Sequence, residues 1–433
     1  MWVPGTGWAR GSGKGRAGGP SLPDNWQLTT VNCYNIDVSE EVFSRLEDVL
    51  ADLREGKPVI VVDDEDRENE GDFVVAAEKV GPETINLMAR EGGGLVCLAL
   101  NPGRFDELEL GLPVPNTSRM GTPFGVPVDA SSVTTGTSAH ERAETARWAS
   151  DEARGPGDFL RPGHLYTLRA SEGGVLRRAG HTEASVDLAR IAGLYPAAVI
   201  CEIMDQDGTM ARLPRLMEVA KRHGLKLITV AEIIRFRLAS EIYVERILVR
   251  PVKTRWGDFV LYLYRDRIKG DIHLALVSGS VREDILVRVQ RECPVGDVFG
   301  SVACDCREQM DSTLFRIGEE GGVFVYLRQE PGSSGTVARI LEHIDPDYLE
   351  RERDEAERYI GTGAQILKDL GVSSMRLLTN NPRKMIGIEG FGLTIAERVP
   401  IQPRPRRENI EHLTKKRDDM GHLIGPLETP EEN

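Results

Sequence analysis

Three cysteines close together in the sequence have the spacing of metal ligands. Cys293, Cys304 and Cys306 form a C-x10-C-x-C pattern. Three thiolates can occupy three corners of a Zn²⁺ tetrahedron and leave the fourth corner to water, which is the arrangement of a hydrolytic site. The alternatives are a closed structural zinc site with a distant fourth ligand, or buried apolar thiols. The open site is favoured because no fourth Cys or His follows at short spacing.

A second and chemically different cluster lies far upstream. The run Asp63-Asp-Glu-Asp-Arg-Glu-Asn-Glu-Gly-Asp72 holds seven carboxylates among ten residues, around a single arginine. A solvated loop is the ordinary explanation for such a charge run. This run, however, directly follows the apolar segment 58–62 and contains Gly71. A carboxylate loop of this kind can bind a hard cation such as Mg²⁺, while its arginine binds a phosphate.

Two histidines next to glycines add candidate site residues. They occur in Arg161-Pro-Gly-His164 and in Arg178-Ala-Gly-His-Thr-Glu183, and both segments are expected to be loops. Glycine beside a histidine allows the backbone to approach a ligand closely. An isolated histidine is more often an ordinary surface or core residue. Spacing alone does not bring either histidine to Glu68 or to Glu202.

Length and composition indicate what kind of protein positions these clusters. A chain of 433 residues suits two domains of about 200 residues each. The formal charge of −14 disfavours nucleic acid as a partner, and no apolar run approaches the roughly 18 residues that span a bilayer. Of the six cysteines, three lie outside the cluster and are scattered. This usage predicts a reducing, cytoplasmic location with metal chemistry and no disulfide framework.

The expected fold class is α/β of the α+β type, with two mixed α/β domains in tandem. We expect the first domain over residues 38–240 and the second over 241–424, with no internal repeat. Helices are predicted at 38–56, 82–90, 184–193, 213–223, 347–358 and 364–370, and strands at 58–62, 95–100, 197–202, 227–230, 259–264, 274–277, 285–289, 322–327 and 375–379.

The two ends of the chain are expected to be tails. Residues 1–37 are rich in Gly and Arg and lack the apolar core of a secretory signal. They are interpreted as a disordered tail, with a transit segment or a start codon placed too early as alternatives. Residues 425–433 are expected to form a polar tail, which contains Pro426 and Pro430.

The first half resembles a known enzyme family. Its motifs are similar to those of 3,4-dihydroxy-2-butanone-4-phosphate synthase over about residues 38–237. The motifs are the acidic run 63–72, Val133-Thr-Thr-Gly136, Arg161-Pro-Gly-His164, Gly173-Gly-Val-Leu-Arg-Arg178, Gly180-His-Thr-Glu-Ala184 and Cys201-Glu202. The resemblance implies conversion of D-ribulose 5-phosphate to formate and a four-carbon phosphate, a riboflavin precursor, with Mg²⁺ (or Mn²⁺) as cofactor.

The same resemblance implies a role for each matching residue. Glu68 and His181 are expected to hold the metal ion. His164 and Glu202 are expected to carry the proton transfers. Substrate binding is expected from Arg67, Glu68, Asp72, Arg178, Ala179, Gly180, His181, Thr182 and Glu202. The family also suggests a homodimer whose synthase sites are shared across the interface.

The second half resembles GTP cyclohydrolase II over about residues 245–424. The similarity rests on the segment Glu292–Gln309, on Gly363-Ala-Gln-Ile-Leu, on Leu378-Thr-Asn-Asn-Pro-Arg-Lys384, and on Thr414-Lys-Lys-Arg with the following Met-Gly-His-Leu. The resemblance implies zinc on Cys293, Cys304 and Cys306. It implies GTP contacts from Arg288, Glu292, Gln309, Thr379 and Lys384.

The second half departs from this family where the triphosphate should be handled. The family has Glu-Gly-Arg-Gly-Ile-Gly where this chain has Glu330-Pro-Gly-Ser-Ser-Gly335. The arginine is therefore missing, and Pro331 removes a backbone N–H from a loop expected to cradle phosphate. The family's Asp-x-Arg pair is not found in residues 353–361: where Arg358 stands in for its arginine, Ala356 replaces its aspartate.

These departures predict a cyclohydrolase-like domain that keeps zinc but has impaired or lost GTP turnover. A further change, at Gln290 and Arg291, alters the family's Arg-Val-His-Ser-Glu run. The alternative is a true bifunctional enzyme that also hydrolyses GTP. A third hypothesis, a structural or ligand-sensing protein that uses neither site, is disfavoured because the motifs of the first half are intact.

Overall fold

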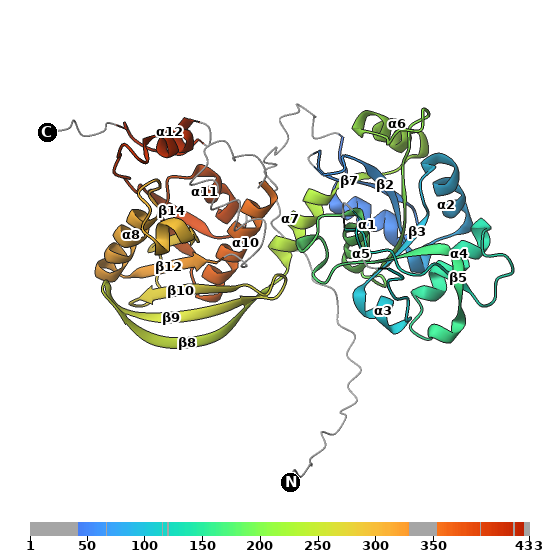
Figure 1. Ribbon diagram of the computed structural model, residues 1–433, viewed down its shortest axis with the longest axis horizontal. Coiled ribbons are helices and arrows are strands. Elements are labelled where there is room, and N and C mark those ends of the chain that lie inside the picture. The colour runs from blue at the N-terminus through green and yellow to red at the C-terminus, as the bar shows by residue number, and fades with distance from the viewer. Residues whose placement is uncertain are drawn as a thin grey trace, which may run out of the picture. The chain divides into compact units, whose positions relative to one another are not determined.

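The computed structural model describes residues 42–328, except 66, 115, 119 and 120, and residues 353–427, except 390, 419 and 420. The chain forms two compact units: unit 1 contains residues up to 170 and 181–230, and unit 2 contains residues 171–180 and 231 onward. Each unit holds a seven-stranded sheet with helices (Figure 1). The expected fold class, two mixed α/β domains in tandem, is confirmed. Among the described helices, none has the length and apolar character needed to cross a membrane.

The sheet of unit 1 has the strand order β4-β5-β3-β6-β2-β1-β7 and mixes parallel and antiparallel pairs. Its strands are β1 (Val59–Val62), β2 (Gly71–Ala76), β3 (Cys97–Leu100), β4 (Val128–Ala130), β5 (Phe159–Arg169), β6 (Ala197–Glu202) and β7 (Leu227–Thr229). Its helices are α1 (Leu46–Arg54), α2 (Pro82–Leu87), α3 (Pro102–Glu107), α4 (Ala139–Ala149), α5 (His181–Ile191) and α6 (Leu213–His223).

Helices cover both faces of this sheet. Successive side chains of a strand point to opposite faces, and every residue of the apolar strand β1 is buried. Ile60 and Val62 belong to a core that also contains residues of α2, α4 and α6. Helix α5 packs on β1, β2, β3 and β6. The loop between β1 and β2 is therefore anchored at both ends by strands inside a packed sheet.

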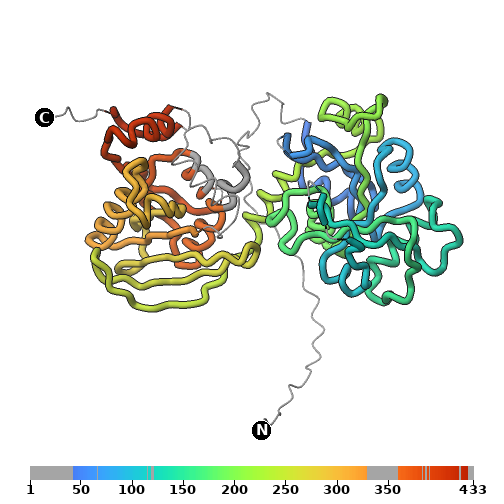
Figure 2. Tube along the Cα trace, in the orientation of Figure 1, coloured from blue at the N-terminus to red at the C-terminus, as the bar shows by residue number. Residues whose placement is uncertain are grey.

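The sheet of unit 2 has the order β14-β13-β11-β12-β10-β9-β8, and its first four strands are parallel to one another. The long antiparallel pair β8 and β9 lies at the opposite edge (Figure 2). The strands are β8 (Val244–Thr254), β9 (Gly257–Asp266), β10 (Ile272–Ser278), β11 (Ile285–Arg291), β12 (Gly322–Leu327), β13 (Ser374–Leu378) and β14 (Thr394–Val399). The helices are α7 (Val230–Ser240), α8 (Cys306–Glu320), α10 (Arg353–Asp369), α11 (Pro382–Glu389) and α12 (Ile410–Asp418).

Alternating residues of β11 divide unit 2 into two cores. Val287 and Val289 pack in one core with residues of α10, whereas Leu286 packs in the other with Leu314 and Ile317 of α8. The parallel strands direct their carboxyl ends to one edge of the sheet, where α/β proteins commonly bind ligands. Cys293 follows β11 and Thr379 follows β13 at this edge.

Two predicted segments differ from the structure. Arg161–His164 was expected in a loop, but these residues lie within β5. They form an irregular stretch of that strand, between Leu160 and Leu165, which pair with β4. The helices expected at 347–358 and 364–370 form the single helix α10 in the described part, since the glycines at 361 and 363 pack closely and do not end it. Residues 38–41 and 347–352 lie outside the described residues.

Candidate active sites

The acidic loop of unit 1 is organised by its first carboxylate. Asp63 follows β1 and its side chain is fully buried. It accepts hydrogen bonds from Arg67 Nη1 at 2.6 Å, from the backbone N–H of Glu70 at 2.8 Å and from that of Glu68 at 3.2 Å. Asp63 is therefore not a solvated residue of a charged loop. Its buried carboxylate holds the loop in shape through these hydrogen bonds.

Glu68, His181 and Asp72 meet in this loop. His181 Nδ1 lies 3.7 Å from Glu68 Oε2 and 3.9 Å from Asp72 Oδ1. His181 and Asp72 are buried, with 6% and 2% of their surface exposed. The histidine reaches the loop because it is the first residue of α5, which packs on β2. One ligand atom each from Asp63, Glu68 and His181 lie within 4.8 Å of one another, a grouping that can hold a metal ion.

The charges of this group depend on one another. The hydrogen bond with His181 lowers the pKa of Glu68 to about 2, although burial opposes it. Burial alone would lower the pKa of His181, but Asp72 and Glu68 raise it to about 9. Burial raises the pKa of Asp72 to about 7. An ionised carboxylate and an imidazole together form a favourable pair of ligands for a metal cation. Such a cation would take the place of the proton on the imidazole.

Glu202 lies next to this group on the neighbouring strand. Asp72 on β2 pairs directly with Glu202 on β6. Glu202 Oε2 accepts the backbone N–H of Leu95 at 2.9 Å, which fixes the carboxylate. The predicted Glu202 therefore lies in the neighbourhood of Asp72, as the sequence analysis needed but could not show.

His164 is held by a carboxylate that the sequence analysis missed. Its Nδ1 lies 2.7 Å from Asp129 Oδ2, and its backbone N–H donates to Asp129 Oδ1 at 2.9 Å. Asp129 is 6% exposed. A Cβ on Gly136 would lie 2.2 Å from Asp129 Oδ2, so this position requires glycine. Among the described residues, no hydrogen bond or ion pair joins His164 or Asp129 to Glu68, His181 or Glu202.

The remaining predicted substrate residues form the turn that enters α5. Arg178 donates its backbone N–H to Gly174 O at 3.1 Å, and Gly180 donates to Arg178 O at 2.9 Å. Ala179 lies between them, and Thr182 is the second residue of the helix and buried. A helix N-terminus with free backbone N–H groups favours a bound anion.

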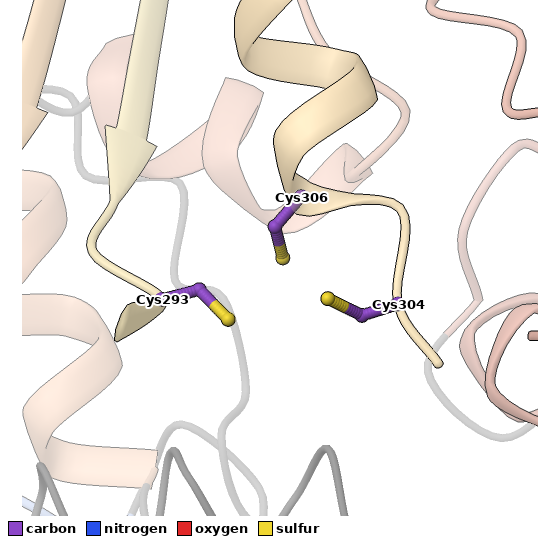
Figure 3. A group of neighbouring side chains, drawn as sticks. All are labelled: Cys293, Cys304 and Cys306. Atoms are coloured by element: carbon purple, nitrogen blue, oxygen red, sulfur yellow. The ribbon is translucent and has the colours of Figure 1, made fainter. Parts of the chain in front are cut away.

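The three cysteines of unit 2 converge on one point (Figure 3). Their sulfur atoms lie within 4.8 Å of one another, and the residues are buried. Cys293 follows β11, and Cys306 begins α8. Hydrogen bonds with Cys293 and Cys306 hold the pKa of the Cys304 thiol far below its usual range. A thiolate is the form that binds zinc, so the local structure favours metal binding.

Tight packing shapes the loop that carries these thiols. A Cβ on Gly296 would lie 2.7 Å from Cys304 Sγ. Asp297 accepts the backbone N–H of Cys293 and the hydroxyl of Tyr326, each at 2.8 Å. It also accepts the side-chain amide of Gln290 at 3.0 Å. Gln290, a departure from the family pattern, thus supports the cysteine loop by a direct hydrogen bond.

The five predicted GTP residues cluster around this loop. Arg288 donates to Gln309 and, at 2.9 Å, to the backbone carbonyl of Leu378, which precedes Thr379. Lys384 Nζ donates to Val289 O at 3.2 Å, and Glu292 lies directly before Cys293. Burial lowers the pKa of Arg288 to about 10, so its guanidinium stays charged. The structure brings the five residues and the cysteines to one edge of the sheet.

Comparisons with known proteins agree with both resemblances. The family model for 3,4-dihydroxy-2-butanone 4-phosphate synthase matches residues 47–236, and that for GTP cyclohydrolase II matches residues 245–400. The riboflavin biosynthesis protein RibBA of Aquifex aeolicus is 50% identical over 398 residues, which are 88% of this chain and 98% of the relative. RibBA of Bacillus subtilis is 46% identical over 396 residues, 88% of this chain and 100% of the relative.

The chain belongs to the RibBA family of riboflavin-biosynthesis proteins. It is an enzyme with a synthase domain of the lyase class followed by a GTP cyclohydrolase II domain of the hydrolase class. Both resemblances seen in the sequence are thereby confirmed. The RibBA relatives favour the bifunctional alternative over the impaired second domain.

A solved structure shares this two-domain arrangement. The crystal structure of RibBX, a two-domain 3,4-dihydroxy-2-butanone 4-phosphate synthase from A. baumannii, is similar with a TM-score of 0.67 and 41% sequence identity. The match covers 82% of this chain and 99% of that protein.

The positions that depart from the cyclohydrolase pattern are only partly described. Glu330–Gly335, including Pro331, follow β12 in the sequence and lie outside the described residues. Ala356 and Arg358 lie in α10, where only the backbone is described. The described part of the second candidate site therefore consists of the loop that carries the three cysteines and the residues after β13.

Proposed function

We propose that unit 1 converts D-ribulose 5-phosphate to 3,4-dihydroxy-2-butanone 4-phosphate and formate with Mg²⁺ (or Mn²⁺), and that unit 2 hydrolyses GTP with Zn²⁺. The GTP products are 2,5-diamino-6-ribosylamino-4-pyrimidinone 5′-phosphate, formate and pyrophosphate. The synthase domain is proposed over 38–240 and the cyclohydrolase domain over 241–424, between tails at 1–37 and 425–433. The small-molecule substrates and the free thiols of the described cysteines support a cytoplasmic location without a nucleic-acid or membrane partner.

The observation that carries the first activity is the buried carboxylate–imidazole group. Asp72 Oδ1 and His181 Nε2 are buried and make no hydrogen bond within the described part of the chain. Buried polar atoms without partners are costly and call for a ligand. Carboxylate oxygens and an imidazole nitrogen fit a divalent cation of the magnesium or manganese type. Glu68 and His181 would hold that cation, which supplies positive charge for the enediolate formed beside the ketone.

The other candidate residues of the synthase domain bind substrate and move protons. Because Asp129 engages Nδ1 of His164, the Nε2 atom is left to accept or return a proton. Glu202, with Oε2 held by Leu95, keeps Oε1 for the second proton transfer. Arg67 and Asp72 bind the sugar, and the turn Arg178–Thr182 binds the phosphate at the start of α5.

The placement of His164 supports a homodimer. The histidine lies on β5, which β3 separates from the strand of Glu202. The Asp129–His164 pair makes no described contact with the Glu68 group. We therefore propose that the synthase sites are shared between two subunits, with His164 of one chain acting on substrate bound by Glu68 and His181 of the other.

The observation that carries the second activity is the convergence of three buried sulfur atoms. The side chains that we propose to bind GTP lie at the same edge of the sheet. Three thiolates leave one position open on a tetrahedral zinc ion. Zinc, when bound, supplies Lewis acidity for the attack of water on the guanine ring. Arg288, Gln309 and Lys384, together with Glu292 and Thr379, are proposed to bind GTP at the same edge of the sheet.

A second candidate is a synthase whose cyclohydrolase domain is impaired. The replacement of the family arginine within Glu330–Gly335 and the change at Ala356 favour it. So does the similarity to RibBX, a two-domain 3,4-dihydroxy-2-butanone 4-phosphate synthase. The high identity to RibBA proteins along both domains favours two activities.

One experiment separates the candidates. The purified full-length protein is given ribulose 5-phosphate with Mg²⁺, and separately GTP with zinc, and formate is measured in each reaction. Formate from both substrates is expected, with pyrophosphate from GTP. Formate from ribulose 5-phosphate alone would establish the impaired second domain, and formate from neither would contradict both candidates.

A further inference from the structure

The C-terminal segment, of which residues 409–418 and 421–424 are described, holds none of the five candidate GTP residues. It contains α12 and the run Thr414-Lys-Lys-Arg followed by Gly421-His-Leu (Figure 1). The segment is firmly attached to unit 2: Leu413 and Asn409 are fully buried, and the preceding Arg406 pairs with Glu308 of α8. Its contacts lead directly to the zinc loop and to the turn after β13.

One contact joins the segment to the cysteine loop. Lys416 Nζ lies 2.7 Å from Asp305 Oδ1, and the side chain of Asp305 is 1% exposed. Asp305 is the residue between Cys304 and Cys306. His412 Nε2 approaches the same oxygen at 3.9 Å. A buried ion pair at this residue fixes the backbone from which two of the three thiols project.

Another contact joins the segment to the nucleotide residues. Leu423 donates its backbone N–H to Asn380 O at 2.8 Å, and Asn380 follows Thr379. The side chain of Asn380 donates a hydrogen bond to Ile401 O and accepts one from the backbone N–H of Ile401. The segment therefore bridges the two halves of the candidate GTP site, the cysteine loop on one side and the turn after β13 on the other.

Between these two contacts lies His422. Its backbone N–H donates to Lys416 O at 2.9 Å. Its Nε2 atom is buried and makes no hydrogen bond in the described chain. Burial, followed by the charges of Lys416 and Lys384, lowers the pKa of His422 to about 4. The imidazole is therefore neutral near pH 7, with an unused hydrogen-bonding atom among cations that attract a polyanion.

We propose that the C-terminal segment forms a wall of the nucleotide site, in which His422 hydrogen-bonds a purine nucleotide through Nε2 and Lys416 positions the cysteine loop through Asp305. This inference rests on the proposed GTP site of unit 2. It explains why a segment beyond the last strand carries buried charge. His422 is a binding residue, and Lys416 is a positioning residue that need not touch the nucleotide.

The test compares variants of the full-length protein. GTP affinity is measured by equilibrium dialysis with zinc present, zinc retention is followed during competition with a chelator, and formate from ribulose 5-phosphate reports the integrity of unit 1. His422→Ala is expected to raise the Kd for GTP about tenfold, as loss of one hydrogen bond predicts, with zinc retention unchanged. His422→Gln should restore part of the affinity.

Lys416→Met is expected to release zinc to the chelator several-fold faster than the unaltered protein. The matched control is Arg417→Ala, because Arg417 on the same helix pairs only with its exposed neighbour Asp418 in the described part. The control should leave both GTP affinity and zinc retention unchanged.

The outcomes separate this inference from the proposed function. An unchanged Kd in His422→Ala, or unchanged zinc release in Lys416→Met, overturns the corresponding half of the inference. If the unaltered protein binds GTP without hydrolysing it, the proposed second activity is wrong. The role of the C-terminal segment is then still tested by the ratio of the Kd for GTP in His422→Ala to that in the unaltered protein. An unaltered protein that binds no GTP overturns both.

Discussion

The two candidate metal sites differ in how far apart their ligand residues lie in the sequence. In unit 2 the three thiols fall within residues 293–306, and Gly296 and Asp297 of the same loop shape the site. In unit 1 Glu68 and His181 are more than a hundred residues apart and meet only because α5 begins beside the loop after β1. A sulfur site needs one loop, whereas the carboxylate–imidazole site needs the assembled sheet.

The two sites also differ in the chemistry of their ligands. The thiolate set is soft and suits zinc, and the oxygen-rich set suits a hard cation. Carboxylates surround the histidine of the unit 1 site, whereas in unit 2 burial and the charges of Lys416, Lys384 and Arg288 lower the pKa of His422. As proposed, one chain would thus bind two different metals and two anionic substrates at separate sites, and single substitutions should separate the activities.

The largest effect is expected from Cys304→Ser. Removing one of three thiolates should abolish stable zinc binding and reduce GTP hydrolysis to background, because a structural or catalytic zinc site needs its full protein ligand set. Elemental analysis after purification under reducing conditions measures the zinc. Formate release from ribulose 5-phosphate should remain unchanged, and a parallel loss of that activity would contradict the independence of the two sites.

A large effect on the other site is expected from Glu68→Gln. The substitution removes the charge that stabilises a cation and the protonated His181, and formate release from ribulose 5-phosphate should fall by about 10²–10³-fold at saturating Mg²⁺. Glu65→Gln is the matched control, since Glu65 is an exposed residue of the same loop. Near-normal activity of Glu68→Gln would show that the acidic loop is not the metal site.

The contrast between the sites also explains what the sequence could predict. The cysteine motif is local, so its spacing alone indicated a zinc site, and the apolar runs that became β1, β6 and β12 were recognised from composition. Asp129 was missed as the partner of His164 because 35 residues separate them, and only the pairing of β4 with β5 brings them together.

Other features escaped prediction for related physical reasons. Arg161–His164 was expected as a loop because proline and glycine are typical of turns; these residues form the irregular part of β5, between the residues that pair with β4. The role of α12 depends on a charge pair between Lys416 and Asp305, 111 residues apart. Such long-range pairs leave no periodic pattern in a single sequence.

A smaller effect is expected from Asp129→Asn in unit 1. The amide keeps the volume but cannot stabilise the protonated imidazole of His164, so the rate of formate release should fall by about ten- to a hundredfold with little change in KM. Asp106→Asn is the control, because Asp106 is an exposed carboxylate paired with Arg169 in the same unit. The kcat should fall in Asp129→Asn alone, and a loss of folding without this selective fall in kcat would indicate a merely structural role.

The smallest expected effect is a change of stability with pH that arises from His273 of unit 2. The pKa of this buried histidine is shifted in the opposite direction from that of His181 in unit 1. His273 in β10 is 1% exposed and accepts the backbone N–H of Arg328 at 3.1 Å on Nδ1. Burial, and then the charges of Arg328 and Lys269, lower its pKa to about 4. His181 in unit 1 has a raised pKa instead, because carboxylates surround it.

The lowered pKa of His273 predicts an acid-sensitive unit 2. The unfolded chain, with a histidine pKa of about 6.5, binds the proton first as the pH falls. The contribution to stability is therefore complete above about pH 6.5 and is lost progressively toward pH 4, amounting to about 2 kcal/mol between pH 7 and pH 5.

Pulse proteolysis in urea, with fragments of unit 2 quantified at each pH, measures the free energy of unfolding. His273→Gln keeps a neutral acceptor and should flatten this pH dependence, whereas His140→Gln, which removes an exposed imidazole of unit 1, should leave it intact. An equal slope in His273→Gln and in the unaltered protein would assign the acid sensitivity of unit 2 to other groups.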